Sequence, residues 1–116
     1  MIRTPEDMTI EIRQRLMDGN GSVEVQHLFT KDELKGKCRM FAKITLAPGS
    51  SVGKHRHEGE EEVYYLLEGQ ATVTDNGQSR LVGPGDAILT GDGGEHSIEN
   101  TGESPLVFMA VILLYN

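Results

Sequence analysis

One stretch, residues 49–69, constrains the chain more than any other part of the sequence. It holds His55 and His57, and a strand places the side chains of residues two apart on the same face. Glu62 follows a glycine-containing break and opens an apolar run, residues 63–67, that is typical of a return strand. A hairpin would bring the Glu62 carboxylate beside both imidazoles. Two nitrogen donors and one oxygen donor at one point predict a first-row transition-metal site.

The composition limits what can surround this site. At 116 residues the chain has the size of one domain, and 18 acidic against 11 basic residues give it a net charge of −7. This charge argues against nucleic acid or an anionic membrane as the main partner. The longest apolar run, residues 106–115, has about half the length that spans a bilayer. A single cysteine, Cys38, excludes an internal disulfide, and residues 1–18 lack a signal-peptide core, so we expect a cytoplasmic protein.

Short apolar runs between turns predict an all-β protein. The chain has fourteen glycines, and residues 22–29 and 38–46 alternate with the period of strands. Asn76-Gly77 is the strongest two-residue hairpin signal in the sequence. We expect eight to ten short strands, spaced by turns as in a sandwich or barrel. Five of them are predicted at residues 71–75, 78–82, 87–90, 96–100 and 106–115.

The N-terminal segment, residues 1–21, precedes the strand-rich domain that we place at residues 22–116. Its beginning, residues 4–7, is typical of a helical turn with proline at the first position. Residues 10–13 suit a short strand equally well, and the sequence leaves helix and strand open. A turn cluster at residues 18–21 ends the segment.

A third histidine, His96, stands where a strand leaves a glycine-rich turn, so that a rigid side chain can point inward. Taken together, these stretches make the chain resemble the cupin family. The first cupin motif is met at Gly49, His55, His57, Glu62 and Gly69, and the second at Gly85, Gly93, His96 and Asn100. At Gly91 the motif has proline instead. We expect this departure to loosen the loop before His96 without moving a ligand.

The resemblance implies a fold, a cofactor and a partner. The fold is a single-domain cupin jelly roll, or double-stranded β-barrel. The cofactor is one divalent transition metal held by His55, His57, Glu62 and His96. The ligand set favours manganese or iron and also admits zinc, nickel, cobalt and copper. Single-domain cupins of this kind are usually homodimers, which makes residues 1–21 a candidate arm for exchange between protomers.

Residues near Glu62 have competing interpretations. Glu61 is the alternative carboxylate ligand, but Gly69 then falls out of register, so Glu62 is preferred. For Glu60 and Glu61 we expect a solvated acidic turn. Tyr64 shares strand parity with Glu62 and is the candidate catalytic residue beside the metal. Core packing with the hydroxyl at the rim is its alternative role.

The predicted centre indicates the kind of molecule that it would bind. Three imidazoles and one carboxylate around a divalent cation leave a charge of about +1, and an octahedral ion keeps two positions open. This favours a small anionic carboxylate or oxo-acid. The implied chemistry is that of a metal-dependent decarboxylase resembling oxalate decarboxylase, a dioxygenase or an isomerase. Because the motifs contain no dedicated general base, a non-catalytic binding or sensor module for a metal–anion complex is the alternative hypothesis.

Overall fold

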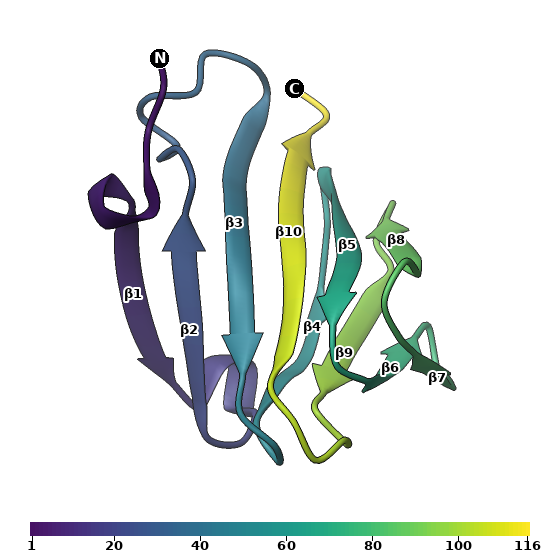
Figure 1. Cartoon of the computed structure of the whole chain (residues 1–116). Coiled ribbons are helices and arrows are strands. Elements are labelled where there is room, and N and C mark those ends of the chain that lie inside the picture. Colours follow the sequence, from purple (N-terminus) through teal and green to yellow (C-terminus); the bar gives the residue numbers. More distant parts are fainter.

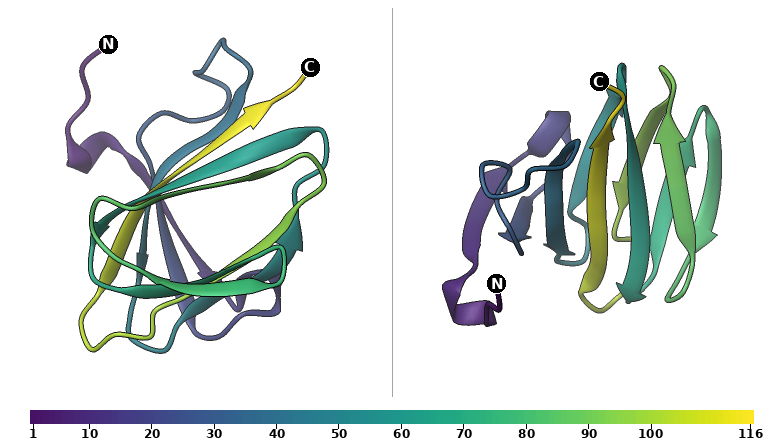
Figure 2. Two further views of the ribbon diagram at one scale, coloured as in Figure 1. Left: turned by 90° about the vertical axis from the view of Figure 1, so that its right-hand side faces the viewer. Right: turned by 90° about the horizontal axis from the view of Figure 1, so that it is seen from above.

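The computed structural model describes all residues, 1–116, and confirms an all-β fold built from two antiparallel sheets (Figure 1). One sheet has six strands in the order β1-β2-β3-β10-β5-β8, and the other has four in the order β4-β9-β6-β7. Figure 2 shows that the two sheets curve around a common interior. The strands are β1 (Thr9–Gln14), β2 (Ser22–His27), β3 (Cys38–Leu46), β4 (Ser51–Arg56), β5 (Glu60–Glu68), β6 (Ala71–Asp75), β7 (Gln78–Val82), β8 (Ala87–Gly91), β9 (Glu95–Glu99) and β10 (Leu106–Leu114).

Both structures that the sequence left open for the N-terminal segment are present. Residues Pro5–Asp7 form the 3-10 helix η1, with proline at its start, and β1 follows directly. A second short helical turn, η2 (Leu16–Asp18), in which Met17 and Asp18 have positive φ, leads towards β2. Strand β1 pairs with β2 of the same chain over six residues and so forms an edge of the six-stranded sheet. Neither η1 nor η2 is long or apolar enough to cross a membrane.

The core lies between the two sheets and follows the alternation of the sequence. On β3, Ala42, Ile44 and Leu46 are buried and Met40 is half-buried, as the strand period predicts. Opposite them on β10 are Leu106, Phe108 and Ala110, which are also buried. The predicted hairpin at Asn76-Gly77 joins β6 to β7, and both turn residues have positive φ, as a type I′ turn requires.

The predicted hairpin between the histidine-bearing and glutamate-bearing strands is wrong. Strand β4 pairs with β9, whereas β5 pairs with β10 and β8 in the other sheet. The backbone of the intervening segment explains the crossing. His57 exchanges hydrogen bonds with the turn before β9, donating to Gly94 and accepting from Gly93. Two residues later, the carbonyl of Gly59 accepts from Tyr115 beyond β10. Because its ends are tied to different sheets, this short segment carries the chain from one sheet to the other.

Candidate metal centre

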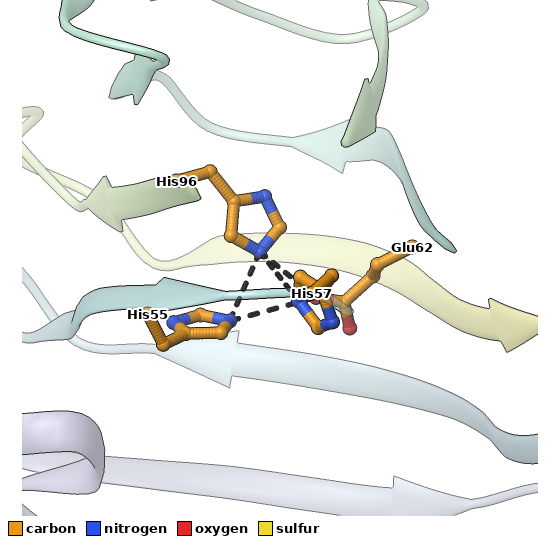
Figure 3. A group of neighbouring side chains, drawn as sticks. All are labelled: His55, His57, Glu62 and His96. Atoms are coloured by element: carbon orange, nitrogen blue, oxygen red, sulfur yellow. Dashed lines mark hydrogen bonds and ion pairs between the residues drawn. The ribbon is translucent and has the colours of Figure 1, made fainter. Parts of the chain in front are cut away.

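Four side chains from the two sheets point toward one another inside the fold (Figure 3). His55 on β4 lies directly opposite His96 on β9, so the pairing of these strands puts both imidazoles on the same face. His57 follows β4 at the start of the crossing, and Glu62 comes from β5 on the facing sheet. We call His55, His57, Glu62 and His96 the donor cluster. The convergence that the sequence predicted is therefore present, although facing sheets rather than a hairpin produce it.

The donor atoms of this cluster are close enough to share one ion. Nε2 of His96 lies 3.0 Å from Nε2 of His57 and 3.0 Å from Nε2 of His55. Oε1 of Glu62 lies 3.0 Å from Nε2 of both His57 and His96, and 3.8 Å from Nε2 of His55. All four donor atoms lie within 4.8 Å of one another. One nitrogen from each ring and one carboxylate oxygen thus surround a single point.

This arrangement fits a divalent metal. Oε1 of Glu62 is buried and has no hydrogen-bond partner, which is costly for a carboxylate unless a cation balances it. Two atoms that bind one ion at about 2.1 Å, with a right angle between them, lie about 3.0 Å apart. The four separations of 3.0 Å have that value. The donor cluster could therefore hold a transition metal, while nitrogen and oxygen donors of this kind suit several metals.

Hydrogen bonds at the far side of two rings orient their donor atoms. Nδ1 of His55 donates to the carbonyl of Gly53 at 2.7 Å. Nδ1 of His57 lies 2.5 Å from Oε2 of Glu60. When Nδ1 carries the proton, Nε2 keeps its lone pair for a metal. The third ring, His96, has no partner at Nδ1 and is held by stacking on Tyr64, with ring centroids 4.7 Å apart.

The expectation that Glu60 lies in a solvated turn is wrong. Its carboxylate accepts two hydrogen bonds from Arg39, at 2.7 and 2.8 Å, in addition to its contact with His57. Its side chain is only 13% exposed, because it lies between these two partners. The sequence held the signal, since Glu60 precedes Glu62 by two residues on the same strand and must share its face. Glu61 points away and lies near Tyr115 instead, which supports Glu62 as the carboxylate of the cluster.

Burial and neighbouring charges set the protonation states at the centre. Burial raises the pKa of the Glu62 carboxyl, but the three surrounding imidazoles outweigh it and hold that pKa well below its usual range. Burial lowers the pKa of His96, which favours its neutral, metal-binding form. Burial also raises the pKa of the Tyr64 phenol well above its ordinary value. At neutral pH Tyr64 is therefore a hydrogen-bond donor rather than a base.

A small cavity of about 80 Å³ lies beside the donor cluster. Tyr64 belongs to its wall, at the place expected from strand parity. Drug-sized ligands occupy pockets of about 300–1,000 Å³, so this cavity suits a ligand of only a few non-hydrogen atoms. Its lining comprises Arg13, Leu16, Met17, Val25, Arg39, Met40, Ile44, Val52, His55, His57, Glu62, Tyr64 and Ile112.

The glycine that replaces the motif proline has a packing role. A Cβ atom at Gly91 would lie 2.5 Å from the Cβ of Glu61, so β8 can approach β5 closely only because no side chain is present. The loop that follows is hydrogen bonded, since Asp92 donates to the hydroxyl of Tyr115 and Gly94 donates to the carbonyl of Gly91. These bonds give no support to the expected loosening.

Comparisons with known proteins agree with the geometry. A family model described as a cupin domain matches residues 42–112. An oxalate-binding protein of Thermotoga maritima is 45% identical over 98% of this chain and 94% of its own length. A crystal structure described as a predicted oxalate decarboxylase from Thermotoga maritima has a TM-score of 0.93 at 45% identity, covering 98% of this chain and 99% of that chain.

A more distant structure shares the fold alone. The polyketide cyclase RemF from Streptomyces resistomycificus has a TM-score of 0.79 at 23% identity, covering 100% of this chain and 80% of that chain. The family model, by contrast, extends from β3 to β10 and so includes every residue of the donor cluster. The predicted resemblance is thereby confirmed, and the chain belongs to the cupin family.

Proposed function

We propose that this protein binds one divalent transition metal at the donor cluster and, through that metal, oxalate or a dicarboxylate of similar size. The observation that carries the proposal is the convergence of three imidazoles and one carboxylate on a cavity of about 80 Å³. A centre with a net charge of about +1 attracts an anion. The cavity has space for a ligand as small as oxalate. The name of the Thermotoga maritima relative, an oxalate-binding protein, supports the same ligand.

Residues of the cavity wall would assist binding without reacting. Val52, Ile44 and Ile112 line the cavity and exclude water from the carboxylate, which strengthens its electrostatic contacts. Tyr64 keeps its proton and can donate a hydrogen bond to a bound oxygen. A bound metal supplies Lewis acidity, and manganese and iron are our preferred ions.

Isothermal titration of oxalate into manganese-loaded protein tests this proposal. We expect saturable binding with one oxalate per chain, and none in the metal-free protein or in His57→Ala. The matched control for metal uptake is His27→Ala, because His27 is the histidine outside the donor cluster and contacts Glu11 instead. Equal oxalate binding with and without metal would overturn the proposal, and so would a wild-type protein that takes up no metal.

Catalysis is the second candidate function, and Tyr64 is the observation that favours it. A protonated phenol in the wall of a metal cavity can donate a proton or a hydrogen bond to a reacting carboxylate. Turnover of oxalate by the metal-loaded protein would be measured as loss of oxalate and release of carbon dioxide. We expect such turnover to vanish in Glu62→Ala and to fall in Tyr64→Phe. Binding of oxalate without turnover would leave the protein as a binding or sensor module.

We also propose that the protein is a homodimer that associates through the outer face of the six-stranded sheet. Large apolar side chains are exposed there on four strands: Ile10, Ile12, Tyr65, Leu89 and Leu113. Exposed apolar patches of this kind mark interfaces. Sedimentation should give twice the monomer mass for the wild type and a monomer for Leu89→Glu. A chelator should leave the dimer intact, because the donor cluster lies on the inner face.

A further inference from the structure

Two arginines stand at the mouth of the cavity beside the donor cluster. Arg13 comes from β1 and Arg39 from β3, and both line the cavity together with Glu62. Both also line a larger outer recess of about 370 Å³ on the same side of the fold. The two hollows share Arg13, Arg39 and Met40, so both arginines lie where the cavity and the recess adjoin.

Each guanidinium is held along one edge only. Arg39 donates from Nε and Nη2 to Glu60, at 2.7 and 2.8 Å. Arg13 donates from Nε and Nη2 to Oε2 of Glu11, at 3.3 and 3.1 Å. A guanidinium has five N–H donors, and Nη1 makes no hydrogen bond within the protein at either residue. The free end of each group can therefore bind a carboxylate with two parallel hydrogen bonds.

The recess is lined by charges of both signs. Three cations, Arg13, Lys31 and Arg39, line it against two carboxylates, Glu11 and Asp32, in a chain whose net charge is −7. Glu11 and Glu60 hold the two guanidinium groups in place, which lowers the entropy lost when a ligand binds them. Because Glu60 also pairs with Arg39, the recess has no net positive charge, and it is the unpaired Nη1 ends of the two arginines that can attract an anion.

We propose that Arg13 and Arg39 are specificity residues that bind the outward oxygens of a metal-bound dicarboxylate. Because of these two arginines, the site binds dicarboxylates more tightly than monocarboxylates of the same size. A monocarboxylate such as glyoxylate can occupy the metal, but it offers the arginines no second carboxylate. This inference rests on the proposed metal-dependent binding of a small carboxylate and adds the basis of its selectivity.

The test compares oxalate with glyoxylate on manganese-loaded protein by isothermal titration. A hydrogen bond to a charged group contributes about 1.5–3 kcal/mol, so Arg39→Gln and Arg13→Gln should each weaken oxalate binding about 10- to 150-fold. The affinity for glyoxylate should change much less. The affinity of Arg39→Lys for oxalate should lie between those of the wild type and Arg39→Gln. Arg80→Gln is the matched control, because it removes the same charge from β7 in the other sheet.

The outcomes separate this inference from the proposed function. Absence of oxalate binding to the metal-loaded wild type would overturn both. If oxalate binds and the arginine variants retain its full affinity, the inference is overturned and the proposed function stands. Manganese affinity, measured without oxalate, gives a further readout. If Arg39→Gln loses manganese while Arg13→Gln binds oxalate normally, Arg39 acts only by positioning Glu60, which also overturns the inference.

Discussion

The interior between the two sheets has two halves of opposite character. In the apolar half, Leu46, Leu66, Leu106 and Phe108 are fully buried and surrounded by other apolar side chains. In the other half three members of the donor cluster are almost as deeply buried, with His57, Glu62 and His96 only 3%, 4% and 1% exposed. There, however, Oε1 of Glu62 and Nδ1 of His96 have no hydrogen-bond partner. Similar burial thus has opposite energetic consequences in the two halves.

The comparison separates what stabilises this fold from what its site can do. Burial of apolar area stabilises the first half at all times. Burial of unpaired polar groups destabilises the second half until a cation binds. Tyr64 lies at the boundary, with its ring centroid 4.7 Å from that of His96 and 4.7 Å from that of Phe108. Rigid packing against Phe108 on one side of Tyr64 therefore helps to hold the imidazole of His96 in position on the other side.

The largest expected effect is on the apolar half. Phe108→Ala removes a fully buried ring and should lower the free energy of unfolding by about 3–5 kcal/mol, because a cavity remains. Urea unfolding of the metal-free protein measures this. Leu81→Ala, at a side chain that is 68% exposed, should change stability by less than about 0.5 kcal/mol. A loss in Phe108→Ala that appears only with metal present would contradict the separation of the two halves.

The next effect concerns the donor cluster. A metal at 100 times its dissociation constant stabilises the folded protein by about 2.7 kcal/mol, and His57→Ala should abolish this gain. In His57→Ala the metal content, measured by mass spectrometry, should fall, and the rise in Tm on adding metal should disappear with it. His27→Ala should keep both. If His57→Ala loses the metal while Tm is unchanged, metal binding is not coupled to the stability of the fold.

A smaller effect is expected at Glu60, which is hydrogen bonded to a member of the donor cluster. Glu60→Gln keeps the shape of the side chain that meets Nδ1 of His57, but it removes the charge. Changes to partners of metal ligands typically cost 10–100-fold in metal affinity, and we expect a loss in that range at unchanged stoichiometry. Glu61→Gln removes the same charge one residue away, on the outer face, and should have no comparable effect. Equal losses in both variants would point to a general effect of charge.

The donor cluster could be predicted from the sequence because its signals are local. Side chains two residues apart share a face of a strand, and this parity holds for His55 with His57 and for Glu62 with Tyr64. The same rule also applies to Glu60, where the expectation of a solvated turn overrode it. The crossing between sheets could not be predicted in this way, since it depends on which distant strands pair with β4 and β5.

The arginines at the cavity mouth show a second limit of the sequence. Arg13 and Arg39 come from strands β1 and β3, which do not pair with each other. No spacing along the chain connects either residue with the donor cluster. Their position depends on the order of strands in the six-stranded sheet and on two acidic partners, Glu11 and Glu60. Features that require tertiary pairing thus become visible only in the fold.

The smallest expected effect lies outside both halves, at the ion pair of Arg3 and Glu33. The Arg3 guanidinium holds the pKa of the Glu33 carboxyl at about 2, below its ordinary value of 4.5. Because the folded pKa is depressed, the pair stabilises the protein above pH 4.5, and this contribution is lost as the pH falls towards 2. The urea midpoints of wild type and Glu33→Gln should therefore differ at neutral pH and converge in acid.

This pair also tests whether the interior halves are independent of the surface. Glu62 titrates in acid as well, but it is present in both proteins, so the difference between their midpoints isolates Glu33. We expect that difference to be the same with and without metal and to shrink in high salt, which screens exposed charges. A difference that depends on metal would mean that the donor cluster and the N-terminal segment are coupled. Metal binding would then affect the stability of the molecular surface as well as that of the metal-binding half of the interior.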